Sequence, residues 1–180
     1  MEGDVKIQNI VVSCDLFTNN CTVKKVVKNI ENVQYDPLKF PGACIRLKEP
    51  KVSILLFDSG RIVISGLKSE DLIIKAIDLL KSKLKKFGVT FSKKPEWKIQ
   101  NMVASGDIGF PLQLTNVVYN LENTEYNPEQ FPGLVYKPKD TRLSFLLFNS
   151  GKIVCTGGRS REEIITAVKA LIEKLKSIKH

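Results

Sequence analysis

The sequence repeats itself once, and no other feature constrains the fold as strongly. The motif Lys-Ile-Gln-Asn at 6–9 returns at 98–101, an offset of 92 residues. The motif Phe-Pro-Gly at 40–42 returns at 131–133, an offset of 91, so one deleted residue separates the two registers. Two copies of about 90 residues are too few and too long for a solenoid. The repeat therefore predicts a duplicated half-domain with an approximate internal two-fold.

Each half is predicted to follow the same order of elements. For the first half we expect a strand over 7–13, a short helix over 22–30 capped by Thr22, a loop over 35–42, strands over 52–57 and 61–65 around a turn at 58–60, and a long helix from Ser69 to Gly88. The long helix is indicated by apolar residues at helical spacing, which recur 91 positions later: Ile73, Ile77, Leu80 and Leu84, then Ile164, Val168, Leu171 and Leu175. In the second half, Ser160 and Glu163 form a predicted capping box. The fold class is thus α+β, with one repeat over 1–94 and the other over 95–180.

One face of the predicted sheet has no helix to cover it. Strand residues alternate between two faces, and the one long and one short helix of each half suffice for a single face. The other face carries apolar side chains in both halves: Leu55, Phe57 and Val63, then Leu146, Phe148 and Val154. A large uncovered apolar patch usually marks a binding site. The alternative is that two sheets pack face to face as a sandwich and hide these side chains.

Cationic and amide side chains surround this uncovered face. Basic residues lie at equivalent points of the two repeats: Arg61, Lys68, Lys152 and Arg159. Asn9 and Asn101 share the face with Val11 and Val103, and their amides can donate to adenine N3 and thymine O2. An apolar floor with a cationic rim suits the DNA minor groove, because phosphates line both of its edges.

The composition agrees with a polyanionic partner. The chain has 28 Lys and Arg against 19 Asp and Glu, a net charge of +9 and a pI of about 9.4. Such a charge favours nucleic acid or an anionic membrane surface. The sequence contains no apolar run of about 18 residues, so no membrane-spanning helix is predicted. The start MEGDVKIQN lacks the basic segment followed by an apolar segment that is typical of a secretory signal.

Catalytic and metal-binding constellations are not expected. The only histidine is His180, so none is available for a triad or a general-base dyad. The four cysteines show no zinc-ligand spacing and are interpreted as reduced, mostly buried side chains: Cys14, Cys21, Cys44 and Cys155. We therefore predict no enzyme activity, no metal and no cofactor.

The repeated motifs resemble those of a known family. The stretches KIQNIV and KIQNMV, YDPLKFPG and YNPEQFPG, and LLFDSGRIVISGLK and LLFNSGKIVCTGGR are similar to the TATA-box-binding protein family in its archaeal form, and the resemblance covers the whole chain. It implies a saddle-shaped, pseudo-two-fold fold. In that fold a ten-stranded antiparallel sheet has a concave DNA-binding face, and four helices lie on the convex back. The resemblance therefore favours an exposed face over the sandwich.

The resemblance also implies roles for individual residues. Those expected to wedge between bases at the two ends of the site are Phe40, Phe57, Phe131 and Phe148. Those expected to contact the minor groove are Asn9, Val11, Leu55, Val63, Ser65, Asn101, Val103, Leu146, Val154 and Thr156. Those expected near phosphates are Lys39, Arg46, Arg61, Lys68, Lys137, Lys152 and Arg159.

The function implied is that of a general transcription initiation factor, which binds and bends A·T-rich (TATA-box) promoter DNA. The implied partners are transcription factor B and the RNA polymerase machinery, with transcription factor B at Glu129 and Gln130. The exposed apolar face would also allow two free copies to pair. The implied location is the nucleoid of an archaeon or the nucleus of a eukaryote.

Some features have more than one interpretation. Lysines 81, 83, 85 and 86 are either a solvated helix end or a surface for transcription proteins or DNA. Pro138 cannot donate a ladder hydrogen bond, so its strand is expected to be edge-like or bulged. Two other functions are weighed: a single-stranded nucleic-acid binder that stacks bases on Phe, and a DNA-repair glycosylase, which would need a base-flipping pocket.

Overall fold

The chain folds into two compact units. The computed structural model describes residues 5–17, 22–28 and 30–178, so the expectations for Cys21 and His180 lie outside the described residues. The N-terminal unit comprises Asn9–Gln100, and the C-terminal unit comprises Met1–Gln8 together with Asn101–His180. Each unit is described by itself.

The described residues of the N-terminal unit form five strands and two α-helices. In chain order they are β1 (Lys6–Asp15), α1 (Val23–Val27), β2 (Val33–Gln34), β3 (Ala43–Leu47), β4 (Val52–Leu56), β5 (Arg61–Leu67) and α2 (Asp71–Leu84), followed by the 3₁₀-helix η1 (Lys85–Phe87). The strand order is β2-β3-β4-β5-β1. The predicted turn at 58–60 is confirmed, because Gly60 N–H donates to Phe57 O at 2.9 Å.

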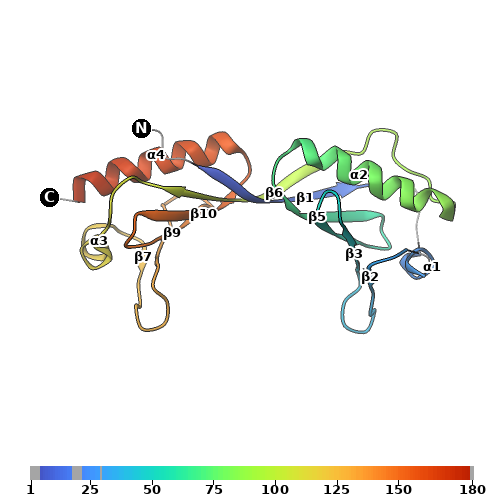
Figure 1. Cartoon of the computed structure of the whole chain (residues 1–180), viewed down its shortest axis with the longest axis horizontal. Helices are drawn as coiled ribbons and strands as arrows, with labels where there is room; N and C mark the ends of the chain where they lie inside the picture. The colour runs from blue at the N-terminus through green and yellow to red at the C-terminus, as the bar shows by residue number, and fades with distance from the viewer. Residues whose placement is uncertain (1–4, 18–21, 29, 179–180) are drawn as a thin grey trace. The chain divides into compact units, whose positions relative to one another are not determined.

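The C-terminal unit has the same order of elements. They are β6 (Trp97–Asp107), α3 (Leu114–Asn120), β7 (Thr124–Glu125), β8 (Leu134–Tyr136), β9 (Ser144–Leu147), β10 (Lys152–Gly158) and α4 (Arg161–Ile178). The strand order is β6-β10-β9-β8-β7. Across the part of the chain that the structure describes, ten antiparallel strands and four α-helices confirm the predicted fold class (Figure 1).

Each unit also includes the start of a strand that lies mainly in the other unit, β1 or β6. In the C-terminal unit, Gln8 Nε2 at the start of β1 donates to Ser105 Oγ on β6 at 2.7 Å. In the N-terminal unit, Gln100 Nε2 on β6 donates to Ser13 Oγ on β1 at 2.6 Å. The two glutamines occupy equivalent positions in the repeats, as do the two serines. The unit boundary therefore runs across β1 and β6.

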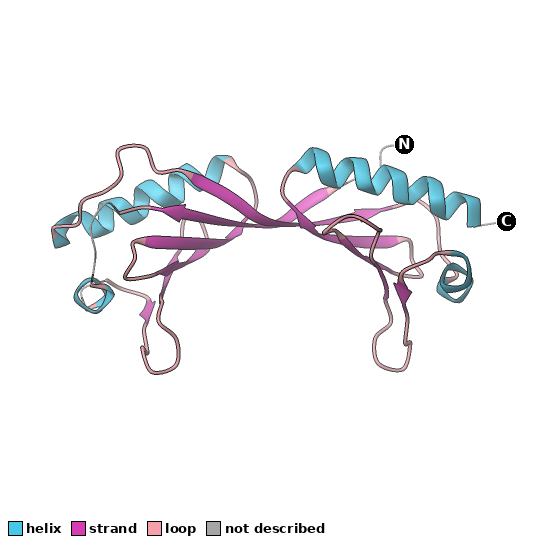
Figure 2. Ribbon diagram, turned by 180° about the vertical axis from the view of Figure 1, so that it is seen from behind, coloured by secondary structure: helices cyan, strands magenta, loops and turns pink. Residues whose placement is uncertain are grey.

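Alternation along the strands separates a buried face from an exposed face. In β4, Val52, Ile54 and Leu56 are buried while Ser53 and Leu55 are half-buried. The buried face packs against the long helix of its own unit, and in Figure 2 none of the described helices lies against the opposite face. The sandwich alternative is therefore wrong.

The long helices bury the apolar stripes that the periodicity predicts. In α2, Ile73, Ile77, Leu80 and Leu84 are at most 1% exposed. The 3₁₀-helix η1, which the pattern did not predict, follows α2, and Gly88 then ends the helical segment with a φ of +67°. Gly suits this position because a left-handed C-cap costs it little.

The helix N-termini differ in part from the prediction. Thr22 is the N-cap of α1 but makes no side-chain cap hydrogen bond; instead Asp58 Oδ1 accepts from Val23 N–H at 2.7 Å. Half of the capping box at Ser160 is confirmed, since its Oγ accepts from Glu163 N–H at 3.1 Å. The Glu163 carboxylate accepts from Arg159 N–H instead of the N–H of Ser160.

The strand before Pro138 is shorter than its counterpart, not bulged. Strand β8 ends at Tyr136, whereas the equivalent β3 runs through Leu47. Tyr136 pairs with Thr124 on one side and Phe145 on the other, so β8 is not an edge strand. The missing N–H of Pro138 thus shortens the ladder, and the expectation of an edge or bulge is wrong.

Candidate nucleic-acid interface

Both units present a half-buried apolar row on the exposed face. In the N-terminal unit, Cys44 pairs with Leu55, and Leu55 pairs with Val63. In the C-terminal unit the equivalent row is Val135, Leu146 and Val154. Val11 and Val103 are half-buried on the same face of their strands. The structure thus brings the predicted floor residues of each unit together.

A pair of phenylalanines lies beside each row, and one of its members follows Leu55 or Leu146 by two residues. The ring centroids of Phe40 and Phe57 are 5.8 Å apart at 66°, and those of Phe131 and Phe148 are 6.1 Å apart at 65°. Phe40 and Phe131 are 45% and 43% exposed. In each pair one ring comes from a loop and the other follows a strand. Edge-to-face contact holds each pair in place while leaving large apolar rings open to solvent.

A glycine lies beneath each pair of rings. A Cβ added at Gly42 would lie 2.8 Å from the rings of both Phe40 and Phe57. At Gly133 the same atom would lie 2.6 Å from the ring of Phe131. The Phe-Pro-Gly motif therefore does more than interrupt a loop, because its glycine leaves room for the rings to lie across the backbone.

The asparagines occupy the same face, one in each unit. Asn9 Oδ1 accepts from the backbone N–H of Gly66 at 2.7 Å, and Asn101 Oδ1 accepts from that of Gly157 at 2.8 Å. Asn101 Nδ2 also lies 3.4 Å from Thr156 Oγ1. Since the oxygens are engaged, each side chain presents its NH₂ group as a donor.

The cations of the exposed face are not equally available. Arg61 donates to both carboxylate oxygens of Asp15, at 2.9 and 3.3 Å, and this hydrogen bonding holds the pKa of Asp15 below its ordinary value. Lys152 is the equivalent of Arg61, and it faces Asp107 in the strand register. Asp107 Oδ1 accepts from Gly109 N–H at 2.9 Å and does not pair with Lys152. Among the described residues, no acidic side chain forms an ion pair with Lys152.

The other predicted phosphate contacts are exposed side chains: Lys39, Arg46, Lys68, Lys137 and Arg159. Arg46 Nη2 donates to Gln34 Oε1 at 3.1 Å, and Lys39 pairs with Asp36 at 3.5 Å. Arg46, Lys51, Ser53 and Ser65 line one groove on the N-terminal unit, so two cations and two hydroxyls lie together there. Exposed pairs of this kind exchange partners at little cost.

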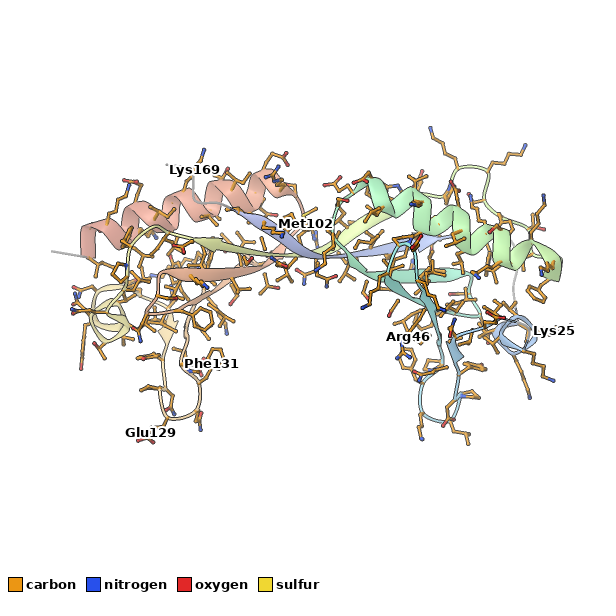
Figure 3. All side chains as sticks on the ribbon, viewed as in Figure 1. Lys25, Arg46, Met102, Glu129, Phe131 and Lys169 are labelled. Atoms are coloured by element: carbon orange, nitrogen blue, oxygen red, sulfur yellow. The ribbon has the colours of Figure 1, made fainter. Side chains whose placement is uncertain are left out.

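Two loops with the same backbone carry different side chains at their tips. We call residues 35–42, between β2 and β3, the first stirrup and residues 126–133, between β7 and β8, the second stirrup. Asp36 and Asn127 Oδ1 accept from the N–H two residues on, at 3.2 Å in both loops. The tip residue is Leu38 in the first stirrup, 97% exposed, and Glu129 in the second. Figure 3 shows Glu129 at the loop tip and Phe131 nearer the sheet.

The sequence interpretation missed two kinds of site residue. Gly66 and Gly157, which hold the asparagines, could have been found as glycines inside strand patterns. Cys44 was missed because β3 had not been predicted. It lies on the apolar row, so it is half-buried and not part of the core. Cys14 and Cys155 are buried as expected, and burial raises the pKa of the Cys155 thiol to about 12.

No His/Cys/Asp/Glu cluster among the residues that the structure describes could hold a metal ion. None of the described helices is long and apolar enough to cross a membrane. Lysines 83, 85 and 86 are exposed at the end of α2 and in η1, and both interpretations of that surface stay predictions.

The comparisons agree with this geometry. Residues 4–87 and 96–178 each match the family "Transcription factor TFIID (or TATA-binding protein, TBP)". The chain is 46% identical to the TATA-box-binding protein of Thermococcus celer, over 95% of this chain and 90% of that protein. It is 47% identical to that of Pyrococcus abyssi, over 95% of this chain and 89% of that one. Its fold matches a solved structure, Methanococcus jannaschii TBP, with a TM-score of 0.90 and 41% identity, over 96% of this chain and 98% of that chain. The chain therefore belongs to the TATA-binding protein family.

Proposed function

We propose that this protein is a general transcription initiation factor that binds A·T-rich promoter DNA through the minor groove and bends it. The observation that carries the proposal is the pair of phenylalanine rings in each unit, one exposed and one half-buried, beside an apolar row. Apolar wedges of this kind unstack base steps, and unstacking kinks the duplex toward the major groove. The cost of a few kcal/mol per step is offset by the wider contact with the opened groove.

Selectivity follows from the polar groups beside the apolar row. The NH₂ groups of Asn9 and Asn101 suit the acceptors that A·T pairs present in the minor groove. Flexible TA steps deform at the least cost, so A·T-rich sites are preferred in two ways. Binding and bending DNA requires no chemical step, so the proposed function needs neither an enzyme activity nor a cofactor.

A circularly permuted gel shift on an A·T-rich duplex tests binding and bending together. We expect complexes whose mobility depends on the position of the site, because a bend near the middle retards DNA most. Single strands of the same sequence should compete poorly. If single strands compete as well as the duplex, the protein is a single-stranded nucleic-acid binder and the proposal is wrong.

The affinity for duplex DNA should fall steeply with salt, because cations on the exposed face replace counterions at phosphates. Lys152→Ala should lower the slope of log K against log salt by about one unit. Arg61→Ala should lower the slope by less, since Asp15 already neutralises Arg61 in the free protein. Titrations at four or more salt concentrations measure both slopes, and equal slopes for wild type and Lys152→Ala would remove that lysine from the phosphate contacts.

DNA should protect Cys44 from alkylation. This thiol is half-buried on the apolar row, whereas Cys14 and Cys155 are buried. Burial also raises the pKa of both buried thiols, so at pH 8 they stay protonated and unreactive. In a Cys21→Ser background, iodoacetamide should label one thiol in the free protein and essentially none in the complex. Labelling of Cys44 at the same rate with and without DNA would place the duplex elsewhere.

The same proposal includes recruitment of transcription factor B and, through it, RNA polymerase. The two DNA faces are near-copies, so a partner that sets one direction must contact something the repeats do not share. The stirrup tips are such a place, because Leu38 and Glu129 occupy equivalent positions on equivalent backbones. We assign transcription factor B to the second stirrup, at Glu129 and Gln130, where a basic protein surface would find a complementary charge.

A further inference from the structure

The central asparagine of each exposed face is held in one orientation by a glycine. An unrestrained amide can rotate by 180° and exchange its oxygen for its nitrogen. Here Asn9 Oδ1 accepts from Gly66 N–H at 2.7 Å, and Asn101 Oδ1 accepts from Gly157 N–H at 2.8 Å. A rotation would bring an NH₂ group against a backbone N–H, donor against donor. The hydrogen bond therefore fixes which end of the amide faces outward.

A β-bulge in each unit supplies this backbone donor. Between the pairs Ile10–Leu67 and Val12–Ile64, β5 contains one residue more than β1. In the C-terminal unit, β10 contains the same extra residue opposite β6. A bulge removes a residue from the strand ladder and turns its N–H away from the neighbouring backbone. The freed N–H is the one that meets the asparagine.

The bulge depends on glycine in both units. Gly66 has a φ of +93° and Gly157 a φ of +91°, a region that other residues rarely adopt. A Cβ added at Gly157 would lie 2.2 Å from Arg142 O, so any side chain would clash there. A Cβ added at Gly66 would lie 3.3 Å from Lys51 O, which leaves backbone conformation as the main obstacle.

Further contacts support the bulge of the C-terminal unit. Arg142 Nε donates to Gly157 O at 2.9 Å, and Arg142 Nη2 donates to Glu163 Oε2 at 2.8 Å. The carbonyl and the N–H of Gly157 are thus both engaged. The contact of Asn101 Nδ2 with Thr156 Oγ1 is long at 3.4 Å, and it uses only one of the two hydrogens on that nitrogen.

We infer that Gly66 and Gly157 are positioning residues for base readout, and that they make Asn9 and Asn101 obligate donors. The inference rests on the proposed minor-groove function and deepens it. A·T pairs present only acceptors in the minor groove, whereas guanine adds its N2 amino group as a donor. A fixed donor can hydrogen-bond to the acceptors of A·T pairs, but it meets the guanine amino group donor against donor. An asparagine free to rotate would accept from guanine N2 and lose this discrimination.

The test uses duplexes that differ by one amino group. Inosine·cytosine and guanine·cytosine pairs differ in the minor groove only by the guanine N2 amino group, so the ratio of their Kd values isolates its effect. One such pair is placed at each position of an otherwise A·T-rich site. Wild type should bind guanine·cytosine at least tenfold more weakly than inosine·cytosine at the central positions.

Gly66→Ala should reduce this ratio to threefold or less at the position that Asn9 reads. It should leave the ratio unchanged at the position that Asn101 reads, which is an internal control in the same protein. Gly66→Asn is the matched variant: it adds the same Cβ, but asparagine tolerates positive φ better than alanine, so it should keep most of the wild-type ratio. A general loss of stability would lower all affinities together and would not move the ratio at one position.

Two results would overturn the inference. One is a folded Gly66→Ala protein that retains the wild-type ratio at every position. The other applies if Gly66→Ala does not fold. The Gly66 amide is then replaced by an ester, which deletes the N–H and keeps the backbone free to adopt positive φ. An unchanged ratio of Kd values in that protein would overturn the inference. Failure of wild type to bind any A·T-rich duplex would instead contradict the proposed function, so the two failures can be told apart.

Discussion

Phe57→Ala and Phe148→Ala should each reduce the DNA bend angle strongly while leaving most of the fold stability. Both side chains are half-buried on the exposed face, and each contacts a partner ring that is itself more than 40% exposed. Their removal deletes a proposed wedge without opening a cavity in the core. Circularly permuted gel shifts measure the bend angle, and thermal melts measure the stability.

Phe145→Ala is the matched control for this result. Phe145 lies on β9, three residues before Phe148, and is 0% exposed. Its truncation should cost about 3–5 kcal/mol of unfolding free energy, as is usual for a buried aromatic side chain. If Phe148→Ala lost as much stability as Phe145→Ala while its remaining complexes bent DNA normally, Phe148 would be a core residue and the wedge assignment would be wrong.

Glu129→Arg should weaken the ternary complex with transcription factor B by tenfold or more and leave binary DNA binding within about threefold. The side chain is exposed at the tip of the second stirrup, and a rim charge shifts the binding free energy by under about 1 kcal/mol. Against a basic partner the new arginine would place like charges in contact, which costs more. Titration of transcription factor B onto preformed DNA complexes measures the change.

Leu38→Arg is the control for the stirrup experiment. Leu38 is the equivalent of Glu129 in the first stirrup and is 97% exposed, so the variant adds a cation to the same backbone. It should leave the ternary affinity near the wild-type value. Equal ternary affinities for wild type and Glu129→Arg would exclude the second stirrup from recruitment.

The sequence predicted the parts of this protein that depend on periodicity. The offset of 91 to 92 residues identified the duplication, and alternation separated the buried Ile54 from the half-buried Leu55. The long helices followed from apolar spacing alone. These features are local or repeat at a fixed interval, so one sequence is enough to recognise them.

Other parts of the site depend on strand register and could not be predicted. The pairing of Arg61 with Asp15 joins residues 46 positions apart, and only the alignment of β1 with β5 brings them together. The bulge at Gly66 shifts that alignment by one residue, which alternation cannot reveal. Strand β2 has two residues, too few for any pattern.

The strand segments at the unit boundary have a consequence for how the chain can assemble. Gln8 reaches a partner 97 positions later and Gln100 a partner 87 positions earlier, so neither unit is complete until both repeats have been synthesised. Cutting the chain between the repeats would leave each fragment without one strand segment. Contacts of such high sequence separation slow folding, because a long loop must close before they form. A one-repeat ancestor would have had to take the missing segment from a second copy of itself, and gene fusion would have converted that concentration-dependent association into an intramolecular step.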